Sequence, residues 1–517
     1  MADRSAAPAP GTDEHLADVD IAEGALLDPA MAHIVDMVLR SVGDGIYEAA
    51  SAEGRSRFHR EVDGPGWRYV VDRVEGRDPL GDTAVDRFSP LAEEQASPHP
   101  TRDVNAYPFA HDQLSQLFDS PAAPDLVAIH TAAHNWADQG GHLGEHGSIG
   151  VVQARAPFVF AGAGVAQRGT VPAAARLVDV APTVLALLGA EPCGGIGANG
   201  THRDDALLAR QDGEVQHAVL DAGARPPEHV VGFLLDGANA NVLYDLAARG
   251  GAPNLARLMA MGTTYQHGAM SSLPTVTLAN HTSILTGAHP GHHGILNNAW
   301  WDRASGRQVI TNSPATWVTS MDAIDPGVET LYQAVARAFP GSTTVSVNEP
   351  CDVGADHSIF GLMRAGEPID RPPPADELPH STQRFVRPVK EYKWSSLIDH
   401  TAVEQFCGIW SGTYRGRSWP LPRFTWVNFS LTDAAFHEGG PYSEIAAASV
   451  ADTDARIGDV LAAVEASGAF DRTAFFVVAD HGMEESDPGC TGNWADALDA
   501  SGVAYRDEGY SFIYVDP

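Results

Sequence analysis

Short runs of β-branched and aromatic residues recur along the chain, and each run ends in polar or turn-forming residues. Six of these runs have the length and apolar character of buried strands: 125–131, 157–165, 229–237, 342–349, 424–433 and 473–482. Helical spacing of apolar residues occupies stretches between them, such as 240–262 and 442–468. This alternation is typical of an α/β fold, and we expect a doubly wound, mostly parallel sheet with helices on both faces.

Composition suggests how the chain is divided. Residues 1–27 are rich in Ala, Pro, Asp and Glu, which predicts a disordered tail. Residues 191–228 are Gly-rich and charged, which predicts a linker. The strand and helix pattern lies in 28–190 and in 229–517, and we interpret 303–420 within the latter as an insertion that forms a smaller cap.

Net charge limits the partners of the protein. The chain has 33 Lys and Arg against 67 Asp and Glu, which gives a formal net charge of −34 at pH 7. Such a surface repels a nucleic-acid duplex or an anionic membrane, and a phosphate ligand would need a local positive centre such as bound divalent metal ions. No stretch approaches the roughly 18 apolar residues of a membrane span, and the first residues lack a basic and then apolar leader pattern. We expect a cytoplasmic protein, and no sequence feature indicates an oligomeric state.

Three of the predicted strands end in aspartates: Asp236, Asp433 and Asp480. Ligands of open α/β sheets bind outside the carboxyl ends of the strands, so these carboxylates should converge. They would repel one another unless cations neutralise them. A lone aspartate at a strand end is more often a helix N-cap, but His437 and His481 accompany two of the three. Mixed Asp and His ligands suit zinc or another borderline divalent ion, so the pattern predicts a metal centre.

A candidate nucleophile lies between the first of these strands and the others. Pro274 and Thr277 precede a helical stretch that Gly287 should end. Thr277 would therefore lie at a helix N-terminus, where free N–H groups and the helix dipole favour a phosphoryl group. The spacing alone leaves open the alternative that Thr277 is only a helix cap.

The segment 271–302 resembles the nucleophile motif of the type I phosphodiesterase/nucleotide pyrophosphatase family, within the alkaline phosphatase superfamily. The shared positions run without gaps and are Thr277, Asn280-His281, Thr286-Gly287, His293-Gly294-Ile295 and Asn298. The resemblance implies an alkaline-phosphatase-like fold and a hydrolase acting on a small phosphoester or nucleotide. It also implies that Thr277 is the nucleophile, with a phosphothreonine intermediate, and that Asn298 donates to the phosphoryl oxygen.

The same resemblance implies two divalent metal ions, zinc or manganese. The ligands of the first would be Asp236, Thr277, Asp480 and His481. Asp433 and His437 would hold the second ion with one more histidine. The family often carries an aromatic residue just after its nucleophile to line a nucleotide-base pocket, and this chain has Leu278 there. Trp300 and Trp301 are candidates to replace that aromatic residue, with core packing as the alternative.

The missing histidine is not where the family usually has it, because no histidine follows His481. A similar Gly-x-His-Gly motif lies in the N-terminal third, where His146 fits best and His142 and His134 are neighbours. Residues 28–190 thus resemble the usual C-terminal part of the catalytic domain and 229–517 the usual N-terminal part. This order predicts a circular permutation in which 191–228 joins the normal ends, with two degenerate domains as the alternative.

Two other functions fit the sequence. Phosphonoacetate hydrolases, which cleave a carbon–phosphorus bond, resemble this chain around Thr277 and bind their substrate's carboxylate with lysines. Lys390 and Lys393, the only lysines, are the candidates for that role. A catalytically silent binding protein on the same scaffold would have lost a ligand or the nucleophile, whereas each position has a candidate here.

Overall fold

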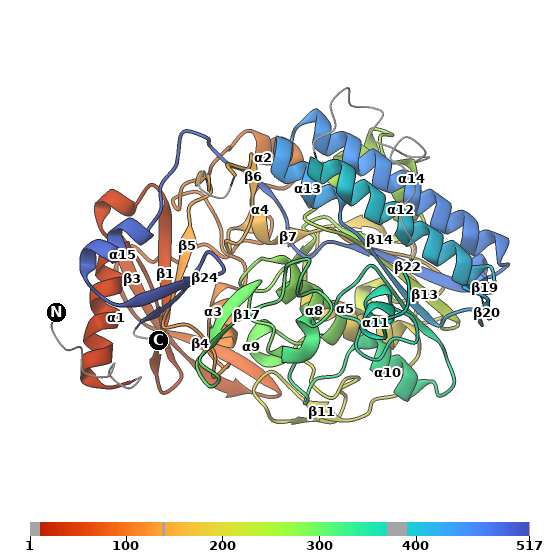
Figure 1. Cartoon of the computed structure of the whole chain (residues 1–517), viewed down its shortest axis with the longest axis horizontal. Helices are drawn as coiled ribbons and strands as arrows, with labels where there is room; N and C mark the ends of the chain where they lie inside the picture. The colour runs from red at the N-terminus through yellow and green to blue at the C-terminus, as the bar shows by residue number, and fades with distance from the viewer. Residues whose placement is uncertain (1–10, 137–139, 370–389, 516–517) are drawn as a thin grey trace.

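The computed structural model describes residues 11–136, 140–369 and 390–515, with residues 390 and 391 described by their backbone alone. Two seven-stranded sheets organise these residues and lie toward opposite ends of the elongated molecule (Figure 1). None of the described helices is long and apolar enough to cross a lipid bilayer.

The first of these is the central α/β sheet, with strand order β18-β21-β13-β22-β8-β14-β9. Its strands are β18 (Thr344–Val347), β21 (Phe424–Phe429), β13 (His229–Leu235), β22 (Thr473–Val478), β8 (Phe158–Gly162), β14 (Gly262–Tyr265) and β9 (Gly169–Val171). The first four run parallel to one another, whereas β8 is antiparallel to both of its neighbours. The predicted doubly wound, mostly parallel sheet is confirmed.

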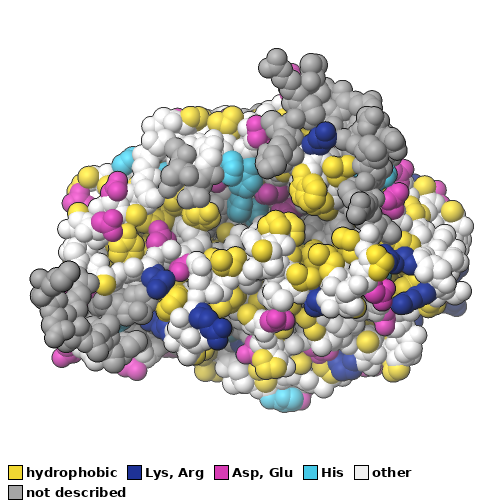
Figure 2. All heavy atoms as spheres, in the orientation of Figure 1, with side chains coloured by type: hydrophobic (Ala, Val, Ile, Leu, Met, Phe, Trp, Pro, Cys, Tyr) yellow, Lys and Arg dark blue, Asp and Glu magenta, His cyan; other side chains and the backbone are white. Residues whose placement is uncertain are grey.

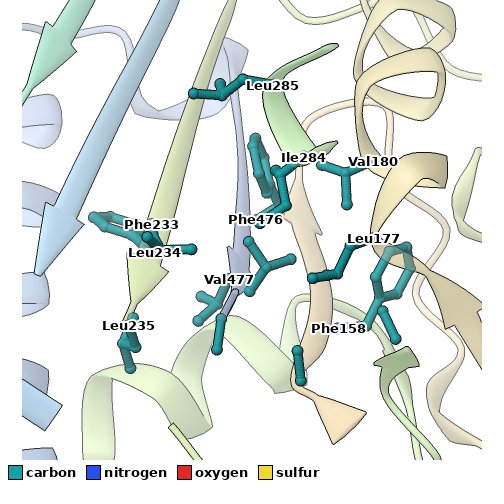
Figure 3. Packing of buried hydrophobic residues seen from close by; sticks show 14 of the residues in the cluster. Phe158, Leu177, Val180, Phe233, Leu234, Leu235, Ile284, Leu285, Phe476 and Val477 are labelled. Carbon is teal, nitrogen blue, oxygen red and sulfur yellow. The ribbon is translucent and has the colours of Figure 1, made fainter. Parts of the chain in front are cut away.

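Helices cover both faces of this sheet (Figure 1). One layer contains α6 (Ala240–Ala248), α7 (Pro253–Ala260), α12 (Lys390–Trp410), α13 (Leu431–Gly439) and α14 (Glu444–Ala466). The other contains α5 (Val180–Leu187), α8 (Thr277–Thr286) and α10 (Leu331–Ala338). Every residue of β13, β21 and β22 is buried, because both faces of the sheet pack against helices. Phe233, Phe476 and Ile284 lie in the core between these layers (Figure 3).

The second sheet is antiparallel throughout and was not expected from the sequence. Its order is β24-β25-β5-β1-β2-β3-β4. The strands are β1 (Val35–Gly43), β2 (Ile46–Ser51), β3 (Gly54–Asp63), β4 (Gly66–Gly76), β5 (Leu126–His130), β24 (Tyr505–Glu508) and β25 (Phe512–Val515). The run 125–131, which we expected in the parallel sheet, is β5 and pairs with β1 and β25. This accessory sheet therefore combines residues from both ends of the chain.

The prediction of a disordered tail at 1–27 is wrong for residues 13–26, and its first ten residues lie outside the described residues. Residues Asp13–Leu26 form helix α1, and the Thr12 side chain caps it by accepting from the His15 N–H. Val19, Ala22 and Leu26 form its buried face, and they pack on the accessory sheet. Acidic composition suggested disorder, but apolar positions spaced by three and four residues determine the structure here.

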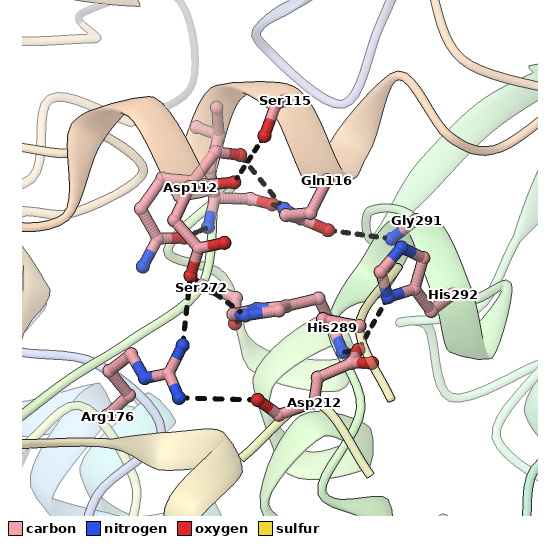
Figure 4. A network of polar contacts seen from close by, with 12 residues as sticks. Asp112, Ser115, Gln116, Arg176, Asp212, Ser272, His289, Gly291 and His292 are labelled. Carbon is pink, nitrogen blue, oxygen red and sulfur yellow. Dashed lines mark hydrogen bonds and ion pairs between the residues drawn. The ribbon is translucent and has the colours of Figure 1, made fainter. Parts of the chain in front are cut away.

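The other predicted boundaries also change. Residues 303–420 are not one insertion, since β18 lies within them and is the edge strand of the central sheet. The segment 191–228 has little regular structure, with two two-residue strands and one 3-10 turn. It nevertheless makes buried polar contacts with other parts of the chain. The Asp212 carboxylate is buried there and accepts from the His289 N–H and from His292 Nδ1 (Figure 4).

Candidate active site

Three carboxylates meet at one edge of the central sheet. Asp236 follows β13 directly, Asp480 follows β22, and Asp433 lies in the first turn of α13, just after β21. These three strands are parallel neighbours, so their carboxyl ends coincide. The Gly237 N–H donates to Asp480 Oδ1 at 2.9 Å, which ties two of the strand ends together.

Three imidazoles point their Nε2 atoms toward these carboxylates. Nδ1 of His437 donates to the Gly144 carbonyl oxygen, Nδ1 of His146 to that of Thr275, and Nδ1 of His481 to that of Gly482, over 2.7–2.9 Å. A carbonyl oxygen only accepts, so each Nδ1 carries a proton and each Nε2 is the ring nitrogen that faces the carboxylates. Backbone contacts of this kind orient histidine ligands in metal sites.

His146 reaches this cluster from the N-terminal third of the chain. Its Nε2 atom lies 3.2 Å from His437 Nε2, although the two residues are 291 positions apart, and 3.9 Å from Asp433 Oδ1. Its ring stacks on that of His481 with a centroid distance of 3.7 Å. The Thr275 hydroxyl fastens the loop by accepting from the Gly147 N–H and donating to the Ser148 carbonyl oxygen.

The antiparallel direction of β8 explains this position. The parallel strands end at the edge where the carboxylates meet, and β8 starts at that same edge, with Phe158 paired to Val478. The residues shortly before β8 are therefore delivered to the site. The strand predicted at 157–165 does join the sheet that carries Asp236 and Asp480.

The two neighbouring histidines occupy different places. The ring of His142 lies 4.6 Å from that of His437, and its side chain is 43% exposed at the pocket. His134 is buried beside Trp136, and its Nε2 donates to the Gly492 carbonyl oxygen at 3.0 Å. His146 is thus the candidate with the shortest contacts to the cluster.

Deeper in the site, Asp236 and Asp480 face a histidine that we had not counted as a site residue. Nε2 of His281 lies 3.7 Å from Asp236 Oδ2 and 3.5 Å from Asp480 Oδ2, and its Nδ1 lies 2.9 Å from Glu349 Oε2. His281 follows Thr277 by one helical turn on α8, which puts both residues on the same face. The spacing of four residues from Thr277 could have identified His281 from the sequence, whereas no sequence pattern pointed to Glu349.

The electrostatics of the cluster are those of an anionic site. Burial and the charges of Asp480 and Asp433 raise the pKa of Asp236 well above its usual value. Burial also opposes ionisation of Asp480, but His481 and His281 outweigh it and hold the pKa of Asp480 well below its usual value. Burial, together with the charges of His481 and His437, lowers the pKa of His146 well below that of a free imidazole.

The donor set fits divalent cations. Among the described residues, Asp236 Oδ1 and Asp433 Oδ1 are buried and have no hydrogen-bond partner, while Asp480 Oδ2 and His481 Nε2 are buried and form an ion pair at 3.0 Å. Three groups of three potential ligand atoms have their atoms within 4.8 Å of one another: His142, Glu145 and His437; His146, Asp433 and His481; and Asp236, His281 and Asp480. Unpartnered carboxylate oxygens and imidazole nitrogens in this arrangement are what a pair of borderline metal ions requires.

Thr277 is the first residue of α8, as expected, and Gly287 ends that helix with φ of +67°. Thr277 is half-buried and lines a pocket of about 240 Å³ together with Asn298, Asp433, His437 and His146. The Asn298 side-chain oxygen accepts from the Leu278 N–H at 3.4 Å, which holds its amide group beside the helix N-terminus. Histidine and acidic side chains gather in a hollow on the face of the molecule that Figure 2 shows.

The structure does not bring the expected substrate-binding residues to this pocket. Trp300 is 3% exposed and packs in the main core, and the ring of Trp301 contacts the Arg506 guanidinium at 3.8 Å. Both belong to a β hairpin, which uses them for packing. Lys393 is exposed on α12 and is not among the residues that line the pocket, and the side chain of Lys390 lies outside the described residues.

Aromatic residues do line the pocket, but they are different ones. Trp136 follows β5 and Tyr510 lies in the turn between β24 and β25, so both come from the accessory sheet. No sequence pattern pointed to them, because their position depends on pairing between the two ends of the chain.

Comparisons with curated proteins find relatives over short segments. The chain is 34% identical over 123 residues to the alkaline phosphatase PafA of Elizabethkingia meningoseptica, which covers 23% of this chain and 21% of that protein. It is 24% identical over 269 residues to ectonucleotide pyrophosphatase/phosphodiesterase family member 3 of Mus musculus, covering 50% of this chain and 25% of that protein. The matched segments thus span about a fifth to a quarter of these relatives.

Solved structures give distant matches. An inactive variant of murine ectonucleotide pyrophosphatase/phosphodiesterase 5 in complex with AMP is 14% identical, with a TM-score of 0.34, over 49% of this chain and 57% of that one. Phosphonoacetate hydrolase from Sinorhizobium meliloti 1021 in complex with phosphonoacetate is 20% identical, with a TM-score of 0.31, over 51% of this chain and 58% of that one.

The family comparison covers more of the sequence. The profile of the family described as type I phosphodiesterase / nucleotide pyrophosphatase matches residues 230–517, which is more than half of the chain. The matched region contains Thr277, Asn298 and the three strand-end aspartates, whereas His146 lies outside it. The chain therefore belongs to the type I phosphodiesterase / nucleotide pyrophosphatase family.

Proposed function

We propose that this protein is a metal-dependent phosphoester hydrolase that prefers diesters and uses Thr277 as its nucleophile. The observation that carries the proposal is the placement of Thr277. It begins α8 and lines the same pocket as Asp433, His437 and His146, next to carboxylate oxygens that lack partners. A helix N-terminus favours the phosphoryl group that such a nucleophile attacks.

Two divalent ions, zinc or else manganese, would occupy the cluster. The residues that would hold one of them are Thr277, Asp236, Asp480 and His481, with His281 next to the two aspartates. The residues that would hold the other are Asp433, His437 and His146. When bound, such ions supply Lewis acidity and neutralise charge on the attacking and leaving oxygens.

The proposed reaction proceeds in two displacement steps. Thr277 Oγ attacks phosphorus, the bond from phosphorus to the ester oxygen breaks, and the proton lost from the Thr277 hydroxyl ends on the departing alcohol, so that the phosphoryl group is carried as a phosphothreonine ester. Water attacks that ester in the second step and restores the threonine hydroxyl, so that two displacements give overall retention at phosphorus. The Asn298 amide and the first N–H groups of α8 hold the non-bridging oxygens throughout.

The charge around the pocket favours a diester over a monoester. Among the described residues that line it there is no lysine or arginine, while Asp433 adds negative charge, and burial together with that charge raises the pKa of Glu145 to about 8. A monoester dianion brings one more negative charge than a diester, and no side chain of this wall neutralises it. For the same reason carbon–phosphorus bond cleavage is not favoured, since Lys393, a candidate to hold a substrate carboxylate, does not line the pocket.

We also propose that the chain is a circular permutation of the family's usual order. The short contacts of His146 and the place of β8 in the central sheet support this. So does the lack of duplicated ligands, since neither part of the chain repeats a ligand that the other supplies. Two degenerate domains would instead each need a core, whereas β8 and β22 share one sheet.

A substrate panel tests the proposed function. The purified protein is assayed with p-nitrophenyl phosphate, bis-p-nitrophenyl phosphate, the p-nitrophenyl ester of TMP and phosphonoacetate, with zinc or manganese added and after chelation. We expect metal-dependent turnover with kcat/KM for the diesters at least tenfold above that for the monoester. Full activity in protein shown to be metal-free by elemental analysis would refute the metal mechanism. Absence of turnover on every substrate, with two ions bound, would indicate a silent binding protein.

A further inference from the structure

The accessory sheet forms the outer wall of the active-site pocket. Trp136, from the loop after β5, and Tyr510, from the turn between β24 and β25, line this pocket together with Thr277 and Asn298. We propose that Tyr510, braced by Trp136, stacks on a planar aromatic group carried by the phosphoester. The proposal rests on the proposed function and names the class of substrate group that the pocket selects.

Trp136 makes a rigid support. It is 7% exposed, and its ring packs edge-on against Trp494 with a centroid distance of 4.8 Å. The ring of His134 lies 4.3 Å away on another side. These contacts belong to the small core under the accessory sheet, so the indole has little freedom to move.

Tyr510 presents the accessible ring. It is 54% exposed, and its ring centroid lies 5.7 Å from that of Trp136. Its backbone has φ of +62°, a left-handed conformation that glycine or asparagine adopts at lower cost than a bulky aromatic residue. Strained residues of this kind persist where function retains them.

The turn is also fixed relative to the catalytic residues. A Cβ atom on Gly509 would lie 2.5 Å from Asn297 Nδ2 and 2.6 Å from the Ala299 carbonyl oxygen, so the two chain segments are in close contact. Asn297 Nδ2 donates to the Gly509 carbonyl oxygen at 3.3 Å and to Ser511 Oγ at 3.4 Å. Since Asn298 is the next residue, the position of Tyr510 is coupled to the proposed phosphoryl-binding amide.

The chemistry of the wall specifies a flat and uncharged ligand group. An aromatic face stacks on any planar ring, and a tyrosine ring does so with little loss of side-chain entropy. Stacking of this kind typically changes affinity by roughly tenfold or more. The ring could be an aryl group or a nucleobase, and both would use the same surface.

A ligand-binding experiment distinguishes an aryl group from a nucleobase. The zinc-loaded Thr277→Ala protein, which lacks the nucleophile, is titrated by calorimetry with two matched pairs of phosphate monoesters: methyl phosphate against phenyl phosphate, and ribose 5-phosphate against AMP. The variants below are made in the same Thr277→Ala background. We expect at least one pair to differ by tenfold or more in Kd in favour of the aromatic member, and the pair that differs identifies aryl or nucleobase. Tyr510→Gly should reduce that ratio to about twofold or less, while Tyr510→Phe should keep it.

Tyr510→Gly is chosen because glycine suits a φ of +62°, so the variant should fold, with a Tm at or above that of the wild type. Trp394→Ala, which removes an exposed aromatic residue of α12 outside the pocket lining, is the matched control and should leave the ratio unchanged. Equal affinities within both pairs, or a ratio that survives in Tyr510→Gly, would overturn the proposal. Because binding is measured without turnover, a failure of the proposed hydrolysis does not affect this test.

Discussion

Replacing His146 tests the assembly of the site most directly, because this residue is the contribution of the N-terminal third. In His146→Ala the cluster keeps Asp433 and His437 but loses the imidazole whose Nε2 lies 3.2 Å from His437 Nε2. The protein should still fold, since the substitution removes one hydrogen bond, to the Thr275 carbonyl oxygen, worth about 1 kcal/mol. The main effect should therefore be on metal binding.

The size of that effect follows from the ligand count. Zinc binding to four-ligand sites releases about 10–16 kcal/mol, so one ligand accounts for roughly 2.5–4 kcal/mol. At 1.4 kcal/mol for each factor of ten, the Kd of one ion should rise roughly 60- to 700-fold. The other ion, held by Asp236 and Asp480, should bind with nearly unchanged affinity.

The assay is a zinc titration of dialysed apoprotein against a chromophoric chelator, with the stoichiometry checked by elemental analysis. His142→Ala is the matched control, because the His142 ring lies as near to His437, at 4.6 Å between centroids, but its side chain is 43% exposed and it does not share a group of potential ligand atoms with Asp433. We expect it to weaken the same ion less than tenfold. Two ions bound to His146→Ala with wild-type affinities would refute both the ligand assignment and the permutation argument.

Two further predictions follow from residues already described. Thr277→Ala should reduce kcat by at least about 1000-fold while two ions remain bound, because one hydroxyl makes the covalent bond, and Thr277→Ser should retain partial activity. If the kcat of Thr277→Ala in steady-state assays lies within tenfold of that of the wild type, Thr277 is only a helix cap. Asp212→Asn should destabilise the protein by about 3 kcal/mol in denaturant titrations at pH 5–6, because His292 loses a buried charged partner. Burial opposes the charged form of each group, but their pairing lowers the pKa of Asp212 and raises that of His292. The loss of unfolding free energy in Asp212→Asn should therefore become smaller as the pH falls below about 4, where Asp212 of the unfolded wild-type chain begins to be protonated. It should also become smaller as the pH rises through the raised pKa of His292. A loss that does not depend on pH would contradict this charge pairing.

Much of the central layer was predictable because its signals are local. The strands that end near Asp236, Asp433 and Asp480 are short apolar runs, and the helix from Thr277 ends at a glycine with the left-handed conformation that such caps use. The direction of β8 was not predictable, because an apolar run looks the same whether its neighbours run parallel or antiparallel. Resemblance, and not periodicity, pointed to His146.

The accessory sheet escaped prediction for a different reason. Its strand β5 lies between β1 and β25, so half of its pairing depends on residues at the far end of the chain. The pocket residues Trp136 and Tyr510 depend on that pairing, and no spacing rule connects them. His281 is the opposite case, because its separation of one helical turn from Thr277 was available in the sequence.

The pairing of β5 with β25 also sets the order of events during synthesis. The Val515 N–H donates to Asp125 Oδ2, which is 390 positions earlier in the chain. A ribosome adding about 5–20 residues per second needs roughly 20 to 80 seconds to cover that distance. Throughout this interval the nascent chain carries β5 with one edge unpaired, and such an edge is prone to aggregation. The tyrosine-bearing turn joins the pocket only after this step, so the pocket is completed only once β25 has been synthesised.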